Sequence, residues 1–345
     1  MRSDSNRSTL GLSRWMVVTS LAIFGPPVSA QEVCGLQSAV YDVIFANGFQ
    51  AASGTLGNAL GTVPSPTIGT TPTIVITYPA ASAQLPANHT AVAGTFTGPD
   101  HTGITVNGKT GYTYNNSFLV PDVPVDASHL TLQATATTLD ELSATASNTV
   151  QLPAPTPSVR LDTDASVGLS PFNIDFFLRA DASLTVQSFT ITYGDGGTFT
   201  GSTGATAIPS HNYTTPGIYI VGASVSTSTG SMTVDHRVII LDVQQLRNRV
   251  CGVYSYLRAE LTAQDVPHAL QAYDPVDRPR YQTFFTSAGS SQLAPLAGLL
   301  GTIASGLVGP NEAHMTVVKT VGGVVQGFPI EFAPDENGVW RIRQM

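Results

Sequence analysis

Three ionisable side chains near the start of the last hundred residues have the types and spacing that acid–base chemistry needs. Asp265, His268 and Asp274 lie close together in the chain and could supply a carboxylate base and a proton carrier. Such groups become catalytic in a pocket that perturbs their pKa values, whereas this stretch predicts a helix, a turn and another helix with solvated charges. We therefore expect no enzymatic activity and assign no catalytic residue.

Metal binding is the second kind of chemistry to consider. Asp162 and Asp164 could offer oxygen atoms to calcium, but the run of oxygen ligands that a calcium loop needs is missing. The seven histidines form no short-spaced pair, and there is no Cys-x-x-Cys motif. We expect neither a metal nor a cofactor. The histidines are His89, His101, His129, His211, His236, His268 and His314.

Nucleophilic and phosphate-binding motifs are also missing from the sequence. No Gly-x-Ser-x-Gly elbow is present, and Gly194-Asp195-Gly196 is not followed by a helix carrying Lys-Ser or Lys-Thr. The two cysteines are Cys34 and Cys251, and Cys251 falls on the apolar face of an expected helix. They form either one disulfide or two unpaired buried thiols, because sequence alone does not bring the sulfur atoms together.

The first thirty residues have the pattern of a secretory signal peptide. Three arginines precede an apolar run at 15–24, and Val-Ser-Ala at 28–30 predicts cleavage between Ala30 and Gln31. An uncleaved anchor is the alternative, although the run is about half of the ~20 residues that span a bilayer. Residues 31–72 begin with helical spacing and continue as a Gly-, Thr- and Pro-rich linker.

Charge is sparse and uneven along the 345 residues. Only 11% of the side chains are Asp, Glu, Lys or Arg, well below the roughly 25% of a typical globular domain. Residues 31–245 hold 4 basic and 14 acidic side chains, and residues 246–345 hold 8 of each. Nucleic acid is therefore excluded as a partner, because phosphate binding needs a basic face.

Residues 73–152 carry the pattern of a β-sandwich. Short β-branched runs at 73–79, 91–96, 104–108, 117–120, 130–136 and 148–152 are separated by turn residues, and Asn107-Gly108 marks a hairpin. The order Gly94-Thr95, Val-Asn-Gly at 106–108, Phe118 and Leu-x-Ala-Thr-Ala at 132–136 resembles bacterial immunoglobulin-like repeats. The resemblance implies an immunoglobulin-like sandwich over about eighty residues.

Residues 158–243 contain a second, more specific pattern. Ile-Thr-Tyr-Gly-Asp-Gly at 191–196 is followed by His-Asn-Tyr at 211–213 and Pro-Gly-Ile-Tyr at 216–219. Gly194 and Gly196 supply backbone freedom in a tight turn, and Asp195 can accept N–H groups there. These strings resemble the PKD domain, an immunoglobulin-like sandwich, with Ile191 and Thr192 in place of the family's usual Trp and Asp. The structural motif residues are Tyr193, Gly194, Asp195, Gly196, His211, Tyr213, Pro216, Gly217 and Tyr219.

Residues 246–345 change to an α+β pattern. Leu246, Val250, Val253, Leu257 and Leu261 predict a helix of about 15–18 residues, and further helices are expected at 266–273, 281–285 and 292–303. Three strands are expected at 313–319, 324–332 and 339–342. The layout and the closing string at 332–342 resemble the cone-shaped fold of nuclear transport factor 2 and ketosteroid isomerase. That likeness concerns the fold, and a shared fold is weak evidence for a shared function.

The sequence thus predicts a mostly β protein with two tandem immunoglobulin-like sandwiches followed by a small α+β domain. We expect an exported protein, periplasmic, secreted or at the cell surface, that binds another surface protein or a polysaccharide. The alternative is a small-molecule-binding or isomerase-like C-terminal domain with the sandwiches as tethers, and a purely structural spacer is a third reading. No stable membrane span is expected after cleavage.

Overall fold

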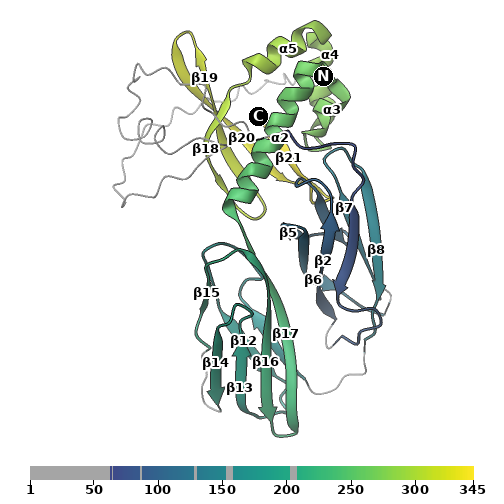
Figure 1. Ribbon diagram of the computed structural model, residues 1–345, viewed down its shortest axis with the longest axis vertical. Helices are drawn as coiled ribbons and strands as arrows, with labels where there is room; N and C mark the ends of the chain where they lie inside the picture. The colour runs from purple at the N-terminus through teal and green to yellow at the C-terminus, as the bar shows by residue number, and fades with distance from the viewer. Residues whose placement is uncertain (1–62, 64, 86–87, 128–129, 153–157, 203–207) are drawn as a thin grey trace, which may run out of the picture. The chain divides into compact units, whose positions relative to one another are not determined.

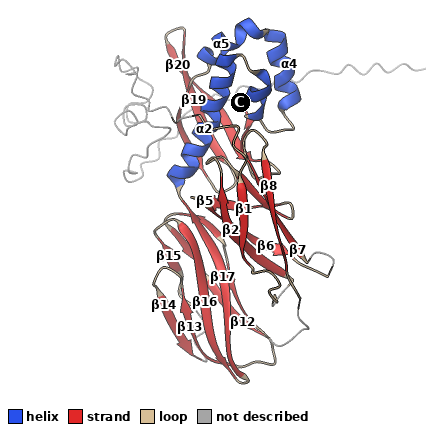
Figure 2. Ribbon diagram, turned by 45° about the vertical axis from the view of Figure 1, so that its right-hand side comes forward, coloured by secondary structure: helices blue, strands red, loops and turns tan. Residues whose placement is uncertain are grey.

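The chain is mostly β in the computed structural model, which describes residues 63, 65–85, 88–127, 130–152, 158–202 and 208–345. Strands make up about half of these residues, and the helices among them fall between Val243 and Leu299 (Figure 2). No helix among the described residues is both long and apolar enough to cross a bilayer. The predicted signal peptide, its cleavage between Ala30 and Gln31, and the linker to 62 lie outside the described residues.

The first group of strands forms two four-stranded antiparallel sheets that share one core. In β1 (Thr73–Tyr78), alternating residues such as Ile74 and Ile76 are buried, as the period of two in a strand requires. One sheet has the order β1, β2 (His89–Thr97), β6 (Ser117–Pro124) and β5 (Tyr112–Tyr114). The other has the order β4 (Lys109–Thr110), β3 (Gly103–Val106), β7 (Thr131–Thr137) and β8 (Ser143–Thr149).

The last strand of this group differs from the expectation. The sequence predicted a strand at 148–152, whereas β8 runs through Ser143–Thr149 and pairs with β7 along its whole length. Its Ser and Ala side chains carry little of the β-branched signal that marks a strand, so the pairing with β7 decides the conformation. The short strands β4 and β5 were missed for a related reason, because two or three residues show no periodicity.

The second group of strands surrounds a separate core of its own. Its main sheet has the order β10 (Val167–Leu169), β17 (Gly230–Leu241), β16 (Gly217–Thr227), β13 (Val186–Thr192) and β14 (Thr198–Ser202). Two small antiparallel pairs complete it: β9 (Val159–Thr163) with β12 (Phe176–Ala180), and β11 (Phe172–Ile174) with β15 (His211–Tyr213). All pairs are antiparallel except β10 with β17.

The long helix α2 (Val243–Ala263) follows β17 after the single residue Asp242 (Figure 1). The Asp242 carboxylate accepts the backbone N–H groups of Gln244 and Gln245 and so caps the helix. The helices α3 (Val266–Gln271), α4 (Arg278–Ala288) and α5 (Ser290–Leu299) come next in the chain. The helix α2 has 21 residues and is longer than predicted. It begins at Val243, directly after the Asp242 cap, whereas the predicted helix began at Leu246.

Four strands follow the helices, one more than expected. Their order is β18 (Thr302–Val308), β19 (Ala313–Val321), β20 (Val324–Pro334) and β21 (Trp340–Gln344). The helix predicted at 292–303 was wrong at its end: α5 ends at Leu299, and residues from Thr302 onward pair with β19. The run of apolar residues before Ile303 gave no boundary between helix and strand, and Gly301 provides the break.

One buried core connects the helices with strands from the other groups. It includes Ala93, Leu119 and Leu139 from the first group of strands, and Ile239 and Leu241 from β17. These side chains pack in the same cluster as α2 and the sheet β18–β21. Several polar side chains are buried beside this shared core, among them Arg249, Asp335 and Arg341.

Candidate functional site

Two of the three acid–base candidates of the sequence, Asp265 and His268, lie at the surface, whereas Asp274 is buried. Asp265 caps α3, accepting the backbone N–H of His268 at 3.1 Å, and its second oxygen lies 2.7 Å from His268 Nδ1. Glu260, which sequence reasoning missed, brings a third ligand atom within 4.8 Å of the other two. About 40% of each side chain of the Asp265–His268 pair is exposed. The hydrogen bond between them lowers the pKa of Asp265 and raises that of His268.

Asp274 does not join this group. Its carboxylate accepts the N–H of Val276 at 3.0 Å and lies 3.3 Å from Arg343 Nε. The space that a cone-shaped fold could use as a pocket is occupied by core side chains, among them the stacked rings of Tyr273 and Tyr281, 3.8 Å apart, and Phe285. An open cleft of about 600 Å³ is lined by Asp274 and Arg343, whereas Asp265 and His268 do not line it.

The two carboxylates weighed for calcium also have other partners. Asp162 lies 2.9 Å from Arg179 Nε in an exposed ion pair. Asp164 Oδ1 accepts the backbone N–H of Asp175 at 2.8 Å and thereby holds the turn between strands. Both carboxylates therefore stabilise contacts between strands.

The Gly-Asp-Gly turn is a structural element whose geometry follows the expected roles. Gly194 and Gly196 have φ values of +85° and +97°. Asp195 accepts the N–H of Gly197 at 2.9 Å and lies 2.7 Å from His211 Nε2. Partial burial acts to raise the pKa of Asp195, but the hydrogen bonds from His211 and Gly197 hold it below its usual range.

Aromatic rings continue this turn into the core of the second group of strands. His211 stacks on Tyr193 with ring centroids 3.9 Å apart. The buried Tyr213 hydroxyl donates to the Tyr193 carbonyl at 2.9 Å, and Tyr219 donates to Thr215 at 2.7 Å. Pro216 precedes Gly217, where β16 begins. These residues fix the turn against the sheet and leave no reactive group free.

We expect Gly194→Ala to lower the free energy of unfolding by about 2–3 kcal/mol. A Cβ at this position would lie 2.7 Å from the Ile220 carbonyl oxygen, and the φ of +85° disfavours any side chain. Gly196→Ala is the matched control, since it shares the positive φ but has nothing within 4 Å of the added atom. Urea unfolding followed by circular dichroism measures both, and equal losses would contradict the role of the Ile220 contact.

Cys251 is disulfide-bonded and buried on α2. Cys34 lies outside the described residues, so its pairing with Cys251 stays a prediction. The disulfide state of Cys251 agrees with the reading of this residue as structural rather than nucleophilic.

Buried polar side chains accompany the shared core where α2 faces residues 99–113. His101 Nε2 lies 2.8 Å from the carbonyl oxygen of Arg249, and Arg249 Nη2 donates to Thr113 Oγ1 at 2.9 Å. Gly252 permits the approach, because a Cβ there would overlap the His101 ring. Burial, with the nearby Arg249 charge, lowers the pKa of His101 to about 4. His101 is therefore neutral at pH 7 and donates from Nε2.

This histidine makes stability depend on pH. Its pKa rises from about 4 in the folded chain to about 6.5 in the unfolded chain, so the unfolded chain binds the proton first as the pH falls. Its contribution is complete above pH 6.5, and we expect a loss of about 3 kcal/mol by pH 4. Urea unfolding from pH 7.5 to 4 measures it. His101→Gln keeps an N–H donor without titrating, and an unchanged pH profile in this variant would contradict the assignment.

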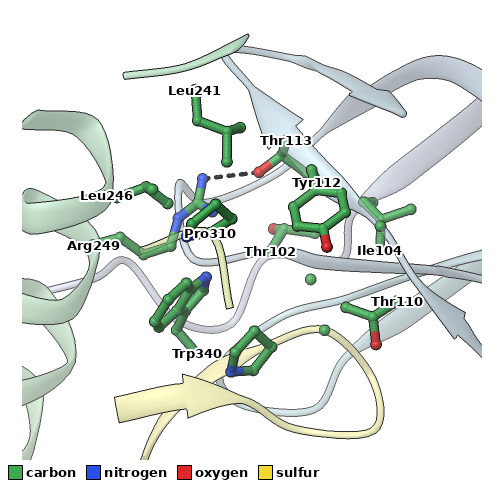
Figure 3. Close-up of a pocket in the computed structure, with 14 residues that line it drawn as sticks. Thr102, Ile104, Thr110, Tyr112, Thr113, Leu241, Leu246, Arg249, Pro310 and Trp340 are labelled. Carbon is green, nitrogen blue, oxygen red and sulfur yellow. Dashed lines mark hydrogen bonds between the residues drawn. The ribbon is translucent and has the colours of Figure 1, made fainter. Parts of the chain in front are cut away.

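A small cavity lies beside Arg249 (Figure 3). It is lined by Thr102 and Thr113 from the first group of strands, by Leu246 and Arg249 from α2, and by Pro310 and Trp340 near the last sheet. Its interior volume is about 10 Å³, about the room that one water molecule needs. We call it the Arg249 cavity. It is too small for an organic substrate or cofactor.

The sequence contains a local signal that marks Arg249 as unusual. Arg249 lies three residues after Leu246 and four before Val253, which places its charge on the apolar face of α2. A charge at such a position must be desolvated when the face is buried, and this marks it as unusual. His101, by contrast, was one of seven scattered histidines, and only the fold brings it to Arg249.

The comparison with protein families agrees with the geometry of the Gly-Asp-Gly turn. Residues 153–240 match the family model described as PKD domain, which confirms the prediction of a PKD domain made for 158–243. A search of curated proteins finds no match to the chain.

Solved structures give weak similarities. An engineered protein solved at 1.98 Å (target OR128) shares 20% identity over 27% of this chain and 22% of its own, with a TM-score of 0.21. The fibronectin(III)-like modules of Clostridium thermocellum CbhA share 8% identity over 50% of this chain and 95% of theirs, with a TM-score of 0.19. Titin domains Z1Z2 in complex with telethonin share 12% identity over 51% and 99%, with a TM-score of 0.19. TM-scores this low support no conclusion about fold or function.

Proposed function

We propose that this chain is an exported, non-catalytic protein that binds another protein at the cell surface or in the periplasm. In this proposal residues 73–152 and 158–243 are tandem immunoglobulin-like sandwiches, and residues 246–345 form an α+β domain related to the nuclear transport factor 2 fold. The PKD match supports an extracytoplasmic location, because PKD domains are typically extracellular. The signal-peptide pattern of the first thirty residues supports export.

Protein binding is supported by the end of the β19–β20 hairpin, whose backbone is drawn in Figure 1. Apolar side chains are exposed there. Val324 is 61% exposed, Val325 is 45% exposed and Phe328 is 37% exposed. Among the described residues, β18 pairs with β19 only as far as Val318, and β21 pairs with β20 only from Glu331 onward. Val324 and Phe328 share one face of β20 and Val325 lies on the other, so apolar side chains are exposed on both sides of this strand end. Exposed apolar side chains at a free strand edge are a feature of protein interaction sites, where a partner strand can add to the sheet.

A protein fits this end of the hairpin better than the other two ligand classes. Strand addition uses backbone hydrogen bonds and alternate side-chain pockets, and both are features of a protein partner. The residues from Val324 to Phe328 carry no charge and no hydroxyl group, and Gln326 is the one side chain among them that can hydrogen-bond to a sugar. The small-molecule alternative has less support, because aromatic and aliphatic side chains fill the space between helices and sheet, and the cleft beside Asp274 is open and lined mostly by charged side chains.

A photo-crosslinking amino acid at Val325, introduced in the exporting cell, tests this proposal. We expect one adduct of defined mass that is lost when Phe328→Ser is added. The matched control places the same probe at Val75, which is 54% exposed on β1 and lies outside the hairpin. No adduct at Val325, or the same adducts at both positions, would overturn the hairpin as the binding site. Binding to a glycan array that survives Phe328→Ser would favour the polysaccharide reading instead.

Export has its own test, because it can fail independently of binding. The mature protein recovered from the periplasm, the surface or the medium is expected to begin at Gln31. A full-length chain that remains in the cytoplasm would overturn the export part of the proposal.

A further inference from the structure

Arg249 is a buried cation whose guanidinium forms no ion pair with a carboxylate among the described residues, and the exposed Asp100 acts on it only at longer range. It is 7% exposed, and its contacts are the hydrogen bond from Nη2 to Thr113 Oγ1 and the His101 bond to its carbonyl oxygen. Its Nε has no hydrogen-bond partner in the described part of the chain. Burial lowers the pKa of Arg249 to about 10, so the guanidinium remains charged at neutral pH. A buried charge is costly unless another charge or several polar groups compensate it.

The side chains around the cavity beside Arg249 include hydrogen-bond donors and no carboxylate. No Asp or Glu lines it. Thr113 Oγ1 accepts from Arg249, so its own hydroxyl proton is free to donate into the cavity. The indole ring of the 3% exposed Trp340 lies against the same space with its nitrogen toward Arg249 (Figure 3). A guanidinium, a hydroxyl and an indole N–H together favour an anion over a cation.

The size of the cavity limits which anion fits. The centre of a water-sized sphere has about 10 Å³ to move in, so the cavity admits one water molecule or a single small ion. Phosphate, sulfate and carboxylates add several heavy atoms and do not fit, whereas a single halide ion has the charge that Arg249 requires. The walls come from β3, β5, α2 and β21, so an ion there would contact segments far apart in sequence.

We propose that the Arg249 cavity binds one chloride ion, which serves as the counter-charge of Arg249 between residues 102–113 and α2. The ion binds the folded chain and not the unfolded chain, so it stabilises the fold in proportion to the logarithm of its concentration. This site is independent of the hairpin proposed for partner binding. It also differs from a surface salt effect, because it depends on the identity of the anion and requires one side chain.

Thermal unfolding in sodium chloride and in sodium gluconate, at equal ionic strength and neutral pH, tests the site. We expect the midpoint in chloride to be about 5 °C higher when chloride reaches a hundredfold excess over its Kd, and to keep rising with the logarithmic slope of one site. Gluconate is too large to enter and is expected to leave the midpoint unchanged. Bromide should replace chloride, and crystals grown in bromide should give an anomalous peak within hydrogen-bond distance of the Arg249 guanidinium.

Two variants separate this site from general salt effects. Arg249→Met fills the same space without charge, and it is expected to fold and to lose the difference between chloride and gluconate. Arg258→Met removes a partly exposed charge from the same helix and should retain the difference. Equal midpoints of the wild-type chain in both salts, a chloride response that persists in Arg249→Met, or a water molecule in place of the bromide peak would each overturn the proposal.

Discussion

Replacing Arg341 by methionine is expected to lower the free energy of unfolding by about 4 kcal/mol, the largest single effect we predict. Arg341 is fully buried, and its Nε donates to Asp335 Oδ2 at 2.6 Å. The guanidinium also donates to the carbonyl oxygens of Gln271 and Leu139, the latter at 3.1 Å. Without Arg341, the Asp335 carboxylate stays buried but loses its cation, and two carbonyl groups lose a hydrogen-bond donor.

Urea unfolding of Arg341→Met and of two companion variants measures this effect. Arg343→Met removes an arginine that is 55% exposed and pairs with Asp274, and we expect a loss below about 1 kcal/mol. The double variant Asp335→Asn with Arg341→Met removes both buried charges and should recover part of the loss. Equal destabilisation by Arg341→Met and Arg343→Met would contradict the importance of burial.

The second large effect is expected at Gly103, where two backbones meet. A Cβ added to Gly103 in β3 would overlap the backbone of Gly338 and Val339, in the turn between β20 and β21. Backbone atoms cannot rotate away as a side chain can, so Gly103→Ala has to displace the turn. We expect a loss of about 3 kcal/mol in the free energy of unfolding.

Gly108→Ala is the matched control for Gly103→Ala. It lies in the adjacent turn at a φ of +79° and has nothing within 4 Å of the added atom, so only the backbone term of about 1 kcal/mol remains. Denaturant unfolding monitored by Trp340 fluorescence should report the contact, because this ring lies beside the same turn. A smaller loss for Gly103→Ala than for Gly108→Ala would show that the two backbones separate at little cost.

Local patterns predicted the strands well where β-branched residues alternate. Ile74 and Ile76 in β1 and the Tyr-Gly-Asp-Gly turn before β14 were visible in the sequence, because adjacent residues carry the signal. The strand β18 was missed because its apolar residues continue the helical run of α5, and only pairing with β19 distinguishes the two.

The polar side chains at the shared core could not be predicted in the same way. Arg341 and Asp335 are six residues apart, yet the pair acquires its role from Leu139 and Gln271. His101 and Arg249 are separated by 148 positions. No local pattern encodes a contact of that range, whereas the position of Arg249 on the apolar face of α2 is a local signal that can be read.

The single parallel pairing in the PKD domain has a mechanical consequence. Strand β10 near the start of this domain runs beside β17 at its end, with Val167, Gly168 and Leu169 opposite Ile239, Ile240 and Leu241. Hydrogen bonds from Ile239 to Ser166 and from Ser170 to Leu241 join them. A force that stretches the domain between its two ends pulls parallel neighbours in opposite directions, so these bonds share the load and must break together. Because β17 continues into α2 through Asp242 alone, tension reaches them without any slack to take up first.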